Sequence, residues 1–442
     1  MSPSVMWFRR DLRLRDHPAL LAACAAGGGS GVVPLFVIDP ALWDSAPASR
    51  RTYLAASLRE LDRSLGGALV VRRGDPAEVL PAVVAEAGAG SVHVSADAAP
   101  FGRRRDAVVT AALAAQGVAW QPLGSPYAVA PGRVLTKAGT GFSVFTPFLR
   151  AWEAHGWRAP AGEPAADQRW LDLGGEPLPE PERATPQPVG EEAALIRWQE
   201  FGDRLLDYPE HRDRPDLEGT TRLSAALRFG EIHPRTILAD LGDSPAAAKL
   251  RAELAWREFH ADVLWRHPSA ARSPLRPEYD GMRLDSPGPG YEAWCAGRTG
   301  FPIVDAGIRE LLASGLMHNR VRMIVASFLI KDLHLDWRLG ARFFLDHLID
   351  GDLASNQLNW QWVAGCGADA APYFRVFNPT TQGRKFDPAG AYVRRWVPEL
   401  REAADPHEPG ITAPSYPSPI LDHAAERKEA IARWQELRAP SP

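Results

Sequence analysis

Short apolar runs alternate with longer Ala- and Leu-rich segments over the first part of the chain. The longer segments repeat apolar residues at three and four, the spacing of one helix face. Strands that alternate with helices build a parallel sheet with helices on both faces. The expected strands are 4–9, 32–38, 68–72, 91–95 and 118–121, and the expected helices are 17–26, 50–65, 76–87 and 103–116. We therefore predict a doubly wound, Rossmann-like α/β domain over residues 1–128, with a ligand crevice at its strand ends.

The pattern changes twice after this domain. Residues 158–190 contain seven prolines and little periodicity, which is typical of a linker. From Glu191 onward apolar residues recur at helical spacing, and no alternating strand pattern follows. The expected helices are 191–206, 223–228, 246–265, 301–313, 318–333, 338–348 and 422–438. We predict an interdomain linker over 129–190 and an all-α domain over 191–442.

Composition narrows the class of protein. The chain has 442 residues, of which 45% are hydrophobic and 24% charged, as in ordinary globular proteins. No apolar run is long enough to span a membrane, and the N-terminus lacks the pattern of a secretory signal. The three cysteines are scattered, which indicates neither a disulfide framework nor a metal site, so we expect a cytoplasmic protein. The net charge of −4 requires any nucleic-acid surface to be a local patch.

The stretch from Asp350 to Trp362 is the strongest candidate for a binding site. It combines two carboxylates (Asp350 and Asp352), side-chain amides that include Asn356 and Asn359, and two tryptophans. Buried polar groups need partners, so a plain core helix would not carry this set. The stretch predicts a buried polar wall with aromatic rings behind it, which suits a large, flat, hydrogen-bonding cofactor.

Two shorter patterns each leave two interpretations open. Glu218–Ser224 places Gly and hydroxyl residues before a helix, where the free N–H groups bind a phosphate, or where a hydroxyl simply caps the helix. Glu253, Trp256 and Arg257 share one helix face, which suits the edge, face and phosphate of a nucleotide. On spacing alone, an ion pair of Glu253 with Arg257 beside a core tryptophan is the better interpretation.

Arg320 and Arg322 lie two residues apart on an expected helix and so face different directions. One can point inward to a carboxylate such as Asp350, and the other outward to a phosphate. An inward Arg–Asp pair would stabilise a negatively charged ring beside it. The simpler interpretation is two surface arginines.

Together, motifs along most of the chain resemble the photolyase/cryptochrome flavoproteins. They are Trp7–Asp16, Gly219–Ser224, Trp256–Phe259, Gly300–Ala306, His318–Met323, Asp350–Asp352, Trp360–Trp362 and Phe377–Gly383. Their order and spacing match the family from the first strand to about Pro398, and the subgroup that they resemble is the class I cyclobutane pyrimidine dimer photolyases.

The resemblance implies FAD bound in the helical domain. The residues implied to hold its phosphates and neighbouring atoms are Tyr208, Thr220, Thr221, Arg222, Leu223 and Ser224. Arg322, Asp350 and Asp352 would surround the ring and ribityl portions, and Asn356 would face the flavin N5. No metal is expected.

The resemblance also implies light-driven repair of DNA. An electron would pass from excited, reduced FAD to a pyrimidine dimer flipped out of the duplex, a step that the base-flipping photolyases exemplify. Glu253 would hydrogen-bond the dimer while holding a proton. Trp256, Trp362 and Met323 would line the lesion pocket. The further residues implied to contact the lesion or the DNA backbone are Arg212, Arg257, Asn319, Arg320 and Gln382.

Two departures from the family pattern bear on the cofactors. Trp360 and Trp337 match the first two members of the family's electron-transfer chain, but the third falls near Leu284. Photoreduction is therefore expected to end elsewhere, with Trp294, Tyr291 and Tyr279 as candidates, or to be inefficient. Ala98–Asp106 lacks the Asn-Glu pair of folate-binding relatives and resembles the Pro-aromatic-Gly-Arg pattern of deazaflavin-type members. This favours 8-hydroxy-5-deazaflavin as antenna, with FMN or no antenna left open.

Three other functions compete with dimer repair. A cryptochrome-type blue-light receptor would bind FAD without repairing DNA, but Glu253, Trp256, Met323 and Asn356 favour repair, as does the lack of a long tail after the last expected helix. A photolyase for (6-4) photoproducts usually has a His near the Asn-Arg motif, which Val321–Met323 does not supply. A purely structural helical protein would leave Asp350–Trp362 unexplained. We therefore expect a monomer that acts on damaged DNA and has no membrane partner.

Overall fold

The computed structural model describes residues 2–369, 375–410 and 413–438. The chain forms two compact units. The first unit contains the chain up to Asp203 together with Thr221–Pro268. The second contains Arg204–Thr220 and the chain from Ser269 onward.

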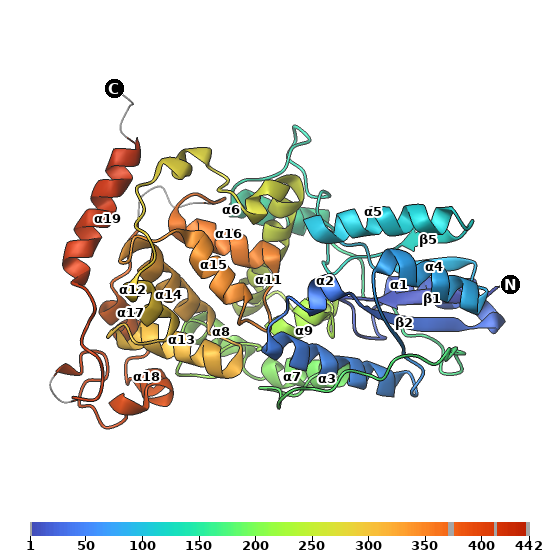
Figure 1. The fold of residues 1–442 in the computed structure, drawn as a ribbon, viewed down its shortest axis with the longest axis horizontal. Coiled ribbons are helices and arrows are strands. Elements are labelled where there is room, and N and C mark those ends of the chain that lie inside the picture. Colours follow the sequence, from blue (N-terminus) through green and yellow to red (C-terminus); the bar gives the residue numbers. More distant parts are fainter. Residues whose placement is uncertain (1, 370–374, 411–412, 439–442) are drawn as a thin grey trace. The chain divides into compact units, whose positions relative to one another are not determined.

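A five-stranded, fully parallel sheet organises the first unit (Figure 1). The strands are β1 (Ser4–Phe8), β2 (Val32–Ile38), β3 (Val70–Arg73), β4 (Ser91–Val94) and β5 (Ala119–Pro122), in the order β3-β2-β1-β4-β5. Val5 of the central strand pairs with Val33 on one side and Val92 on the other, and all three are fully buried. Every predicted strand is present. β1 and β2 are buried along their whole length, and buried parallel strands read as continuous apolar runs.

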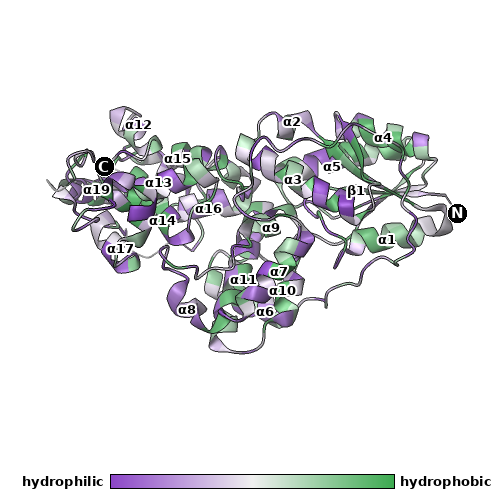
Figure 2. Cartoon of the chain, turned by 90° about the horizontal axis from the view of Figure 1, so that it is seen from below, coloured by the Kyte–Doolittle hydropathy of each residue, from purple (hydrophilic) through white to green (hydrophobic). Residues whose placement is uncertain are grey.

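Helices cover the two faces of this sheet. They are α1 (Pro18–Gly27), the short α2 (Pro40–Trp43), α3 (Ala48–Ser64), α4 (Pro76–Ala87) and α5 (Pro100–Ala114). The chain adds strands on one side of β1 up to β3 and then crosses back to add β4 and β5 on the other side. Right-handed crossovers therefore place α1 and α3 on one face of the sheet and α4 and α5 on the other. Figure 2 draws α1 and α4 largely in the hydrophobic colour, in keeping with their Ala- and Val-rich sequences. The predicted doubly wound architecture is confirmed.

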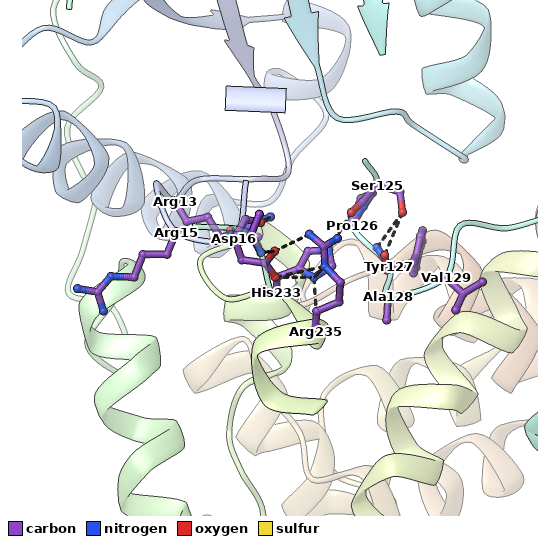
Figure 3. A network of polar contacts seen from close by, with 12 residues as sticks. Arg13, Arg15, Asp16, Ser125, Pro126, Tyr127, Ala128, Val129, His233 and Arg235 are labelled. Carbon is purple, nitrogen blue, oxygen red and sulfur yellow. Dashed lines mark hydrogen bonds and ion pairs between the residues drawn. The ribbon is translucent and has the colours of Figure 1, made fainter. Parts of the chain in front are cut away.

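Five more helices complete the first unit. They are α6 (Phe145–His155), α7 (Glu191–Gly202), α9 (Ser224–Phe229), α10 (Pro234–Asp240) and α11 (Pro245–Arg266). A buried polar network joins α10 to the loop after β1, because Asp16 accepts hydrogen bonds from Arg235 (Nη2 to Oδ1, 2.5 Å) and lies 3.3 Å from His233 (Figure 3). Buried Glu258 of α11 likewise accepts from the backbone N–H of Val129 and from the indole of Trp152.

The compact units divide the chain differently from the predicted domains of 1–128 and 191–442, which stay a prediction. Helices α9 to α11 group with the sheet rather than with the helices that follow them. The predicted linker of 129–190 contains helix α6, whereas its Pro-rich part, 158–190, is irregular apart from a single bridge between Trp170 and Val32.

The described residues of the second unit form helices joined by loops, with no strand among them. Its α-helices are α8 (Tyr208–His211), α12 (Pro289–Cys295), α13 (Pro302–Ser314), α14 (Asn319–Lys331), α15 (Trp337–Leu345), α16 (Leu353–Ala364), α17 (Pro379–Phe386), α18 (Ala391–Trp396) and α19 (His423–Arg438). Helix α14 lies at the centre, since it packs against α13, α15 and α16 and is buried from Ile324 to Lys331. This confirms the predicted all-α second half.

Two global expectations concern membranes and cysteines. Across the described ranges, no helix is long and apolar enough to cross a membrane. Cys24, Cys295 and Cys366 are free thiols, as the scattered spacing predicted.

Candidate functional site

An ion pair between Arg322, whose side chain is half-buried, and the buried Asp350 is the centre of the candidate site in the second unit. Arg322 of α14 donates from Nη2 to Asp350 Oδ2 at 2.9 Å and from Nε to the carbonyl of Met317 at 2.8 Å. The Asp350 side chain is 3% exposed, and its other oxygen, Oδ1, has no hydrogen-bond partner among the described residues. The predicted inward Arg–Asp pair is confirmed, and it leaves one buried acceptor open for a donor from outside the protein.

Helix α16 supplies the polar wall beside this pair. Asp352 caps the helix by accepting from the backbone N–H of Ser355 at 3.0 Å. Asn356 is 8% exposed and donates from Nδ2 to the carbonyl of Ala341 (3.0 Å) and to Oε1 of Gln357 (2.9 Å), which fixes its orientation. Asn359 does not belong to the wall as predicted: it is exposed and bonds back to the carbonyl of Ser355.

The second arginine of α14 is already paired. Arg320 forms an ion pair with Asp213 (Nη2 to Oδ2, 3.0 Å), and its guanidinium lies 4.5 Å from the centre of the Phe386 ring. The sequence indicated no partner for it other than a phosphate. Arg212 also lies 3.9 Å from Asp213, so two arginines share this one carboxylate, and the Arg212 guanidinium lies 5.6 Å from the centre of the Tyr208 ring.

The remaining residues of the second unit that were predicted to contact the lesion or the DNA differ in exposure. Asn319, the first residue of α14, is exposed, whereas Gln382, Met323 and Trp362 are half-buried. The Trp362 indole donates to the carbonyl of Asp369 at 3.0 Å, which orients the ring. Trp360 is 2% exposed and Trp337 fully buried, so both electron-transfer candidates lie in the core.

The hydroxyl segment before α9 is not an ordinary side-chain cap. Leu223 occupies the cap position and is buried, and no side chain caps the helix. Thr221 accepts a hydrogen bond at 3.3 Å from the backbone N–H of Leu223, which is the cap residue itself and not a residue of the first helical turn. Ser224, the first residue of the helix, is exposed. Arg222 has a φ of +51°, which an arginine rarely adopts. The ordinary capping interpretation is therefore wrong, and the phosphate-binding interpretation stays a prediction.

The predicted nucleotide face of α11 lies in the first unit. Trp256 stacks on Phe145 with ring centroids 3.6 Å apart and an interplanar angle of 8°. Arg257 donates to the carbonyls of Pro126 (2.8 Å) and Leu227 (3.2 Å), so its guanidinium holds two neighbouring segments. Neither partner was visible from the spacing of the motif, because both lie far away in the sequence.

The segment Ala98–Asp106, predicted to bind an antenna, forms the start of α5 and joins a charged cluster around Trp7. Arg9 and Arg105 lie 4.8 Å and 4.9 Å from the centre of the Trp7 ring. Arg9 pairs with Asp106 at 2.6 Å, and Arg105 pairs with Asp97 at 3.3 Å.

A cavity of about 690 Å³ opens next to this segment. Its lining combines cations, hydroxyls and aromatic rings: Arg103, Thr140, Gly141, Phe142, Ser143, Trp265, Arg266, His267 and Pro268. The guanidinium of Arg103 lies 5.4 Å from the centre of the Trp265 ring. Sequence reasoning missed this cavity; the run of Trp, Arg and His at the end of α11 was the signal that could have found it.

The arrangement in the second unit fits a bound flavin. A flat heteroaromatic ring with N–H and hydroxyl donors satisfies the open Asp350 Oδ1, and the Arg322 cation offsets negative charge on such a ring. An unpaired buried carboxylate oxygen is costly, so the protein alone leaves this interaction incomplete.

Family models match both parts of the chain. Residues 4–167 match the DNA photolyase family, and residues 250–436 match the FAD binding domain of DNA photolyase. The deoxyribodipyrimidine photo-lyase of Halobacterium salinarum is 40% identical, over 98% of this chain and 99% of that protein.

Solved structures show the same architecture. The crystal structure of a class III photolyase from Agrobacterium tumefaciens has a TM-score of 0.91 and 37% identity, covering 99% of this chain and 98% of that one. A cryptochrome from Synechocystis sp. PCC6803 has a TM-score of 0.88 at 26% identity, covering 98% and 99% of the two chains. An archaeal photolyase from Sulfolobus tokodaii, described with two FAD molecules, has a TM-score of 0.85 at 28% identity, with the same coverage.

Proposed function

Because this chain belongs to the DNA photolyase family, we propose that it repairs cyclobutane pyrimidine dimers in DNA by a light-driven reaction of bound, reduced FAD. The single observation that carries the proposal is the Arg322–Asp350 pair with its open Oδ1. Relatives named deoxyribodipyrimidine photo-lyase that match over nearly the whole chain support it. The class I assignment stays a prediction, since a class III photolyase is among the similar structures.

Bound FAD supplies the electron that splits the dimer, and the protein supplies the environment. Arg322 would supply a cation to offset negative charge on the reduced ring. Asp350 Oδ1 would accept a hydrogen bond from the cofactor, and Asp352 holds the first turn of α16. Asn356, whose amide is fixed by Ala341 and Gln357, would face the flavin N5 as the family resemblance implies.

We assign recognition of the lesion to Glu253, Trp256, Trp362 and Met323, and contacts with the DNA backbone to Arg212, Asn319 and Gln382. Trp256, stacked on Phe145, offers a rigid aromatic surface. Arg257 and Arg320 act by holding their own segments, because their guanidinium groups already bond to carbonyls and to Asp213.

A spectrum and a repair assay test the proposal. The purified chain, reconstituted with FAD, should show flavin absorbance and restore irradiated oligothymidylate under blue light. Binding of FAD without repair would favour the cryptochrome interpretation, and repair of (6-4) photoproducts alone would favour the other photolyase type. A chain that stays colourless after reconstitution contradicts all three.

Substitution of Glu253 tests how the lesion is held. If Glu253 donates a proton to a dimer carbonyl, Glu253→Ala should lower repair by about fivefold at unchanged FAD content, since one hydrogen bond is worth about 1 kcal/mol. Glu253→Gln keeps a donor and should retain more activity. Glu153→Gln, an exposed position on α6, serves as the matched control. Equal repair by all three variants would remove Glu253 from the mechanism.

For the antenna, we propose that the cavity beside Arg103 takes a flat, anionic second chromophore, with 8-hydroxy-5-deazaflavin the favoured ligand. Trp265 and Phe142 offer stacking surfaces, and Arg103 offers positive charge, whereas Arg266 already pairs with Asp262 at 2.8 Å. The test is reconstitution with the deazaflavin, read as a new band in the excitation spectrum of flavin-dependent repair. Arg103→Ala should weaken its binding, whereas the adjacent, exposed Arg104→Ala should not.

A further inference from the structure

The aromatic rings around Trp360 form a continuous path to the surface of the second unit. The Trp360 ring lies 6.5 Å from that of Trp294, at an interplanar angle of 73°. The Trp294 ring in turn lies 6.0 Å from that of Tyr291, nearly parallel at 14°. Trp294 is fully buried, whereas Tyr291 is partly exposed. Rings in contact transfer electrons quickly, because tunnelling weakens steeply with distance.

Local sequence explains why the last two rings stack. Tyr291 and Trp294 are three residues apart on α12, which places them on the same helix face. The indole N–H of Trp294 donates to the carbonyl of Val325 on α14 at 3.2 Å. This carbonyl dipole fixes the ring and stabilises positive charge on it during electron transfer.

The path through Trp337 differs in the hydrogen bonding and charge around its ring and in its last position. Trp337 is fully buried, and its indole N–H has no hydrogen-bond partner within the described residues. The guanidinium of Arg338 lies 5.4 Å from its ring centre, which raises the energy of a cationic ring, although Asp336 and Asp280 offset part of that charge. Leu284, where a third ring would stand, is aliphatic.

A tyrosine at the end of such a path must also release its phenolic proton. Tyr291 is exposed enough to pass that proton to water, whereas the other candidate, Tyr279, is 3% exposed in the core. Burial and a hydrogen bond with the Cys295 thiol raise the pKa of Tyr291 to about 12, so the residue is protonated before the reaction.

We propose that Tyr291 is the terminal electron donor of flavin photoreduction in this chain, reached from Trp360 through Trp294; the proposal rests on the proposed function. One electron passes from Trp360 to the excited oxidised flavin, and Trp294 and then Tyr291 refill the vacancy. Tyr291 loses one electron and one proton, the proton to water. A thiol in the medium then returns one hydrogen atom to the tyrosyl oxygen and becomes a thiyl radical.

The test uses the full chain loaded with oxidised FAD and illuminated in the presence or absence of a thiol. Freeze-trapped samples are examined by electron paramagnetic resonance, with ring-deuterated tyrosine to identify the radical. We expect a tyrosyl radical in the parent chain, its loss in Tyr291→Phe and Trp294→Phe, and its persistence in Trp337→Phe. Tyr279→Phe is the matched tyrosine control and should keep the radical.

Loss of the radical in Trp337→Phe, or its persistence in Tyr291→Phe, would overturn the proposal. Tyr291→Phe removes only a partly exposed hydroxyl, so it keeps the test decisive even if Trp294→Phe does not fold. Repair by each variant is measured after chemical reduction of the flavin and should be unchanged. If Tyr291→Phe repairs DNA at the parent rate and keeps an unaltered radical, this path alone is refuted. A parent chain that binds no FAD refutes the proposed function and this inference with it.

Discussion

At the scale of single residues, neighbouring charges on α14 have separate functions. Arg322 points to Asp350, whose side chain is 3% exposed, while Arg320, at the start of the same helix, points to Asp213 in the segment after α8. Arg320 and Arg322 are two residues apart, so their side chains leave the helix axis in directions about 200° apart. The two arginines therefore cannot exchange partners without rotation of the helix. The inner pair is the more costly to break, since removing one partner leaves a buried charge uncompensated.

Asp350→Asn should therefore weaken FAD binding strongly. The substitution removes the charged acceptor that the proposed function gives to FAD, and a hydrogen bond to a charged group is worth about 2 to 3 kcal/mol, or about thirty- to a hundredfold in affinity. The measurement is fluorescence titration of the apoprotein with FAD, with the thermal midpoint recorded to separate loss of binding from loss of fold. The matched control is Asp346→Asn, which breaks the exposed pair with Arg342 and should change either quantity little. Equal affinities for the two variants would show that Asp350 does not hold the cofactor.

At the scale of elements, α14 depends on an unusual cap. His318 accepts from the backbone N–H of Arg320 through Nδ1 at 3.2 Å, a role in which the ring must be neutral. The pKa of His318 is lowered to about 4, chiefly by burial; Arg322 and Arg320 also lower it, while Asp213 opposes them. The helix that carries Arg320, Arg322 and Met323 thus starts at a residue whose charge state sets its capping ability.

The stability that His318 contributes should fall in acid. The unfolded chain binds a proton to this residue below its ordinary pKa of 6.5, whereas the folded chain resists protonation until about pH 4. The contribution is therefore complete above pH 6.5 and is lost as the pH falls from 6.5 towards 4, by about 3 kcal/mol at most. Asn caps helices well and does not titrate, so His318→Asn should lack this loss.

Urea unfolding of both proteins between pH 4 and pH 7 measures the difference. The parent chain should lose stability relative to His318→Asn as the pH is lowered, and the other histidines cancel in the comparison. A difference that is constant across this range would contradict the assignment.

At the scale of the whole molecule, the sheet and helices α9 to α11 form one compact unit through buried polar contacts (Figure 3). Asp16 is 2% exposed and receives Arg235, His233 and the backbone N–H of Ala161 (2.8 Å). Arg13, also buried, donates to the carbonyls of Gly230 and Asp16. A single carboxylate thus connects three segments that are far apart in the sequence.

Asp16→Asn should destabilise the first unit by about 3 kcal/mol, because it leaves the buried Arg235 without its charged partner. Asparagine tolerates the φ of +47° at this position, so backbone strain does not confuse the result. The control is Glu163→Gln, which removes the exposed partner of Arg15 and should change stability by less than about 1 kcal/mol. Calorimetric unfolding of both variants measures the loss; similar midpoints would show that the network carries little stability.

The sequence by itself determined the features that repeat at short range. Strand and helix periods predicted the parallel sheet and the helical second half, and the spacing of Arg320 and Arg322 predicted one inward arginine. Resemblance of motifs, rather than periodicity, assigned roles to Glu253 and Asn356.

Only the tertiary structure decided which distant side chains meet. It paired Arg320 with Asp213, tied Arg257 to Pro126 and Leu227, and placed Trp294 edge-on to Trp360. It also opened the cavity beside Arg103 and grouped α9 to α11 with the sheet. A helical or strand period reports only which face of an element is buried, and the residue that covers that face is settled by packing over the whole chain.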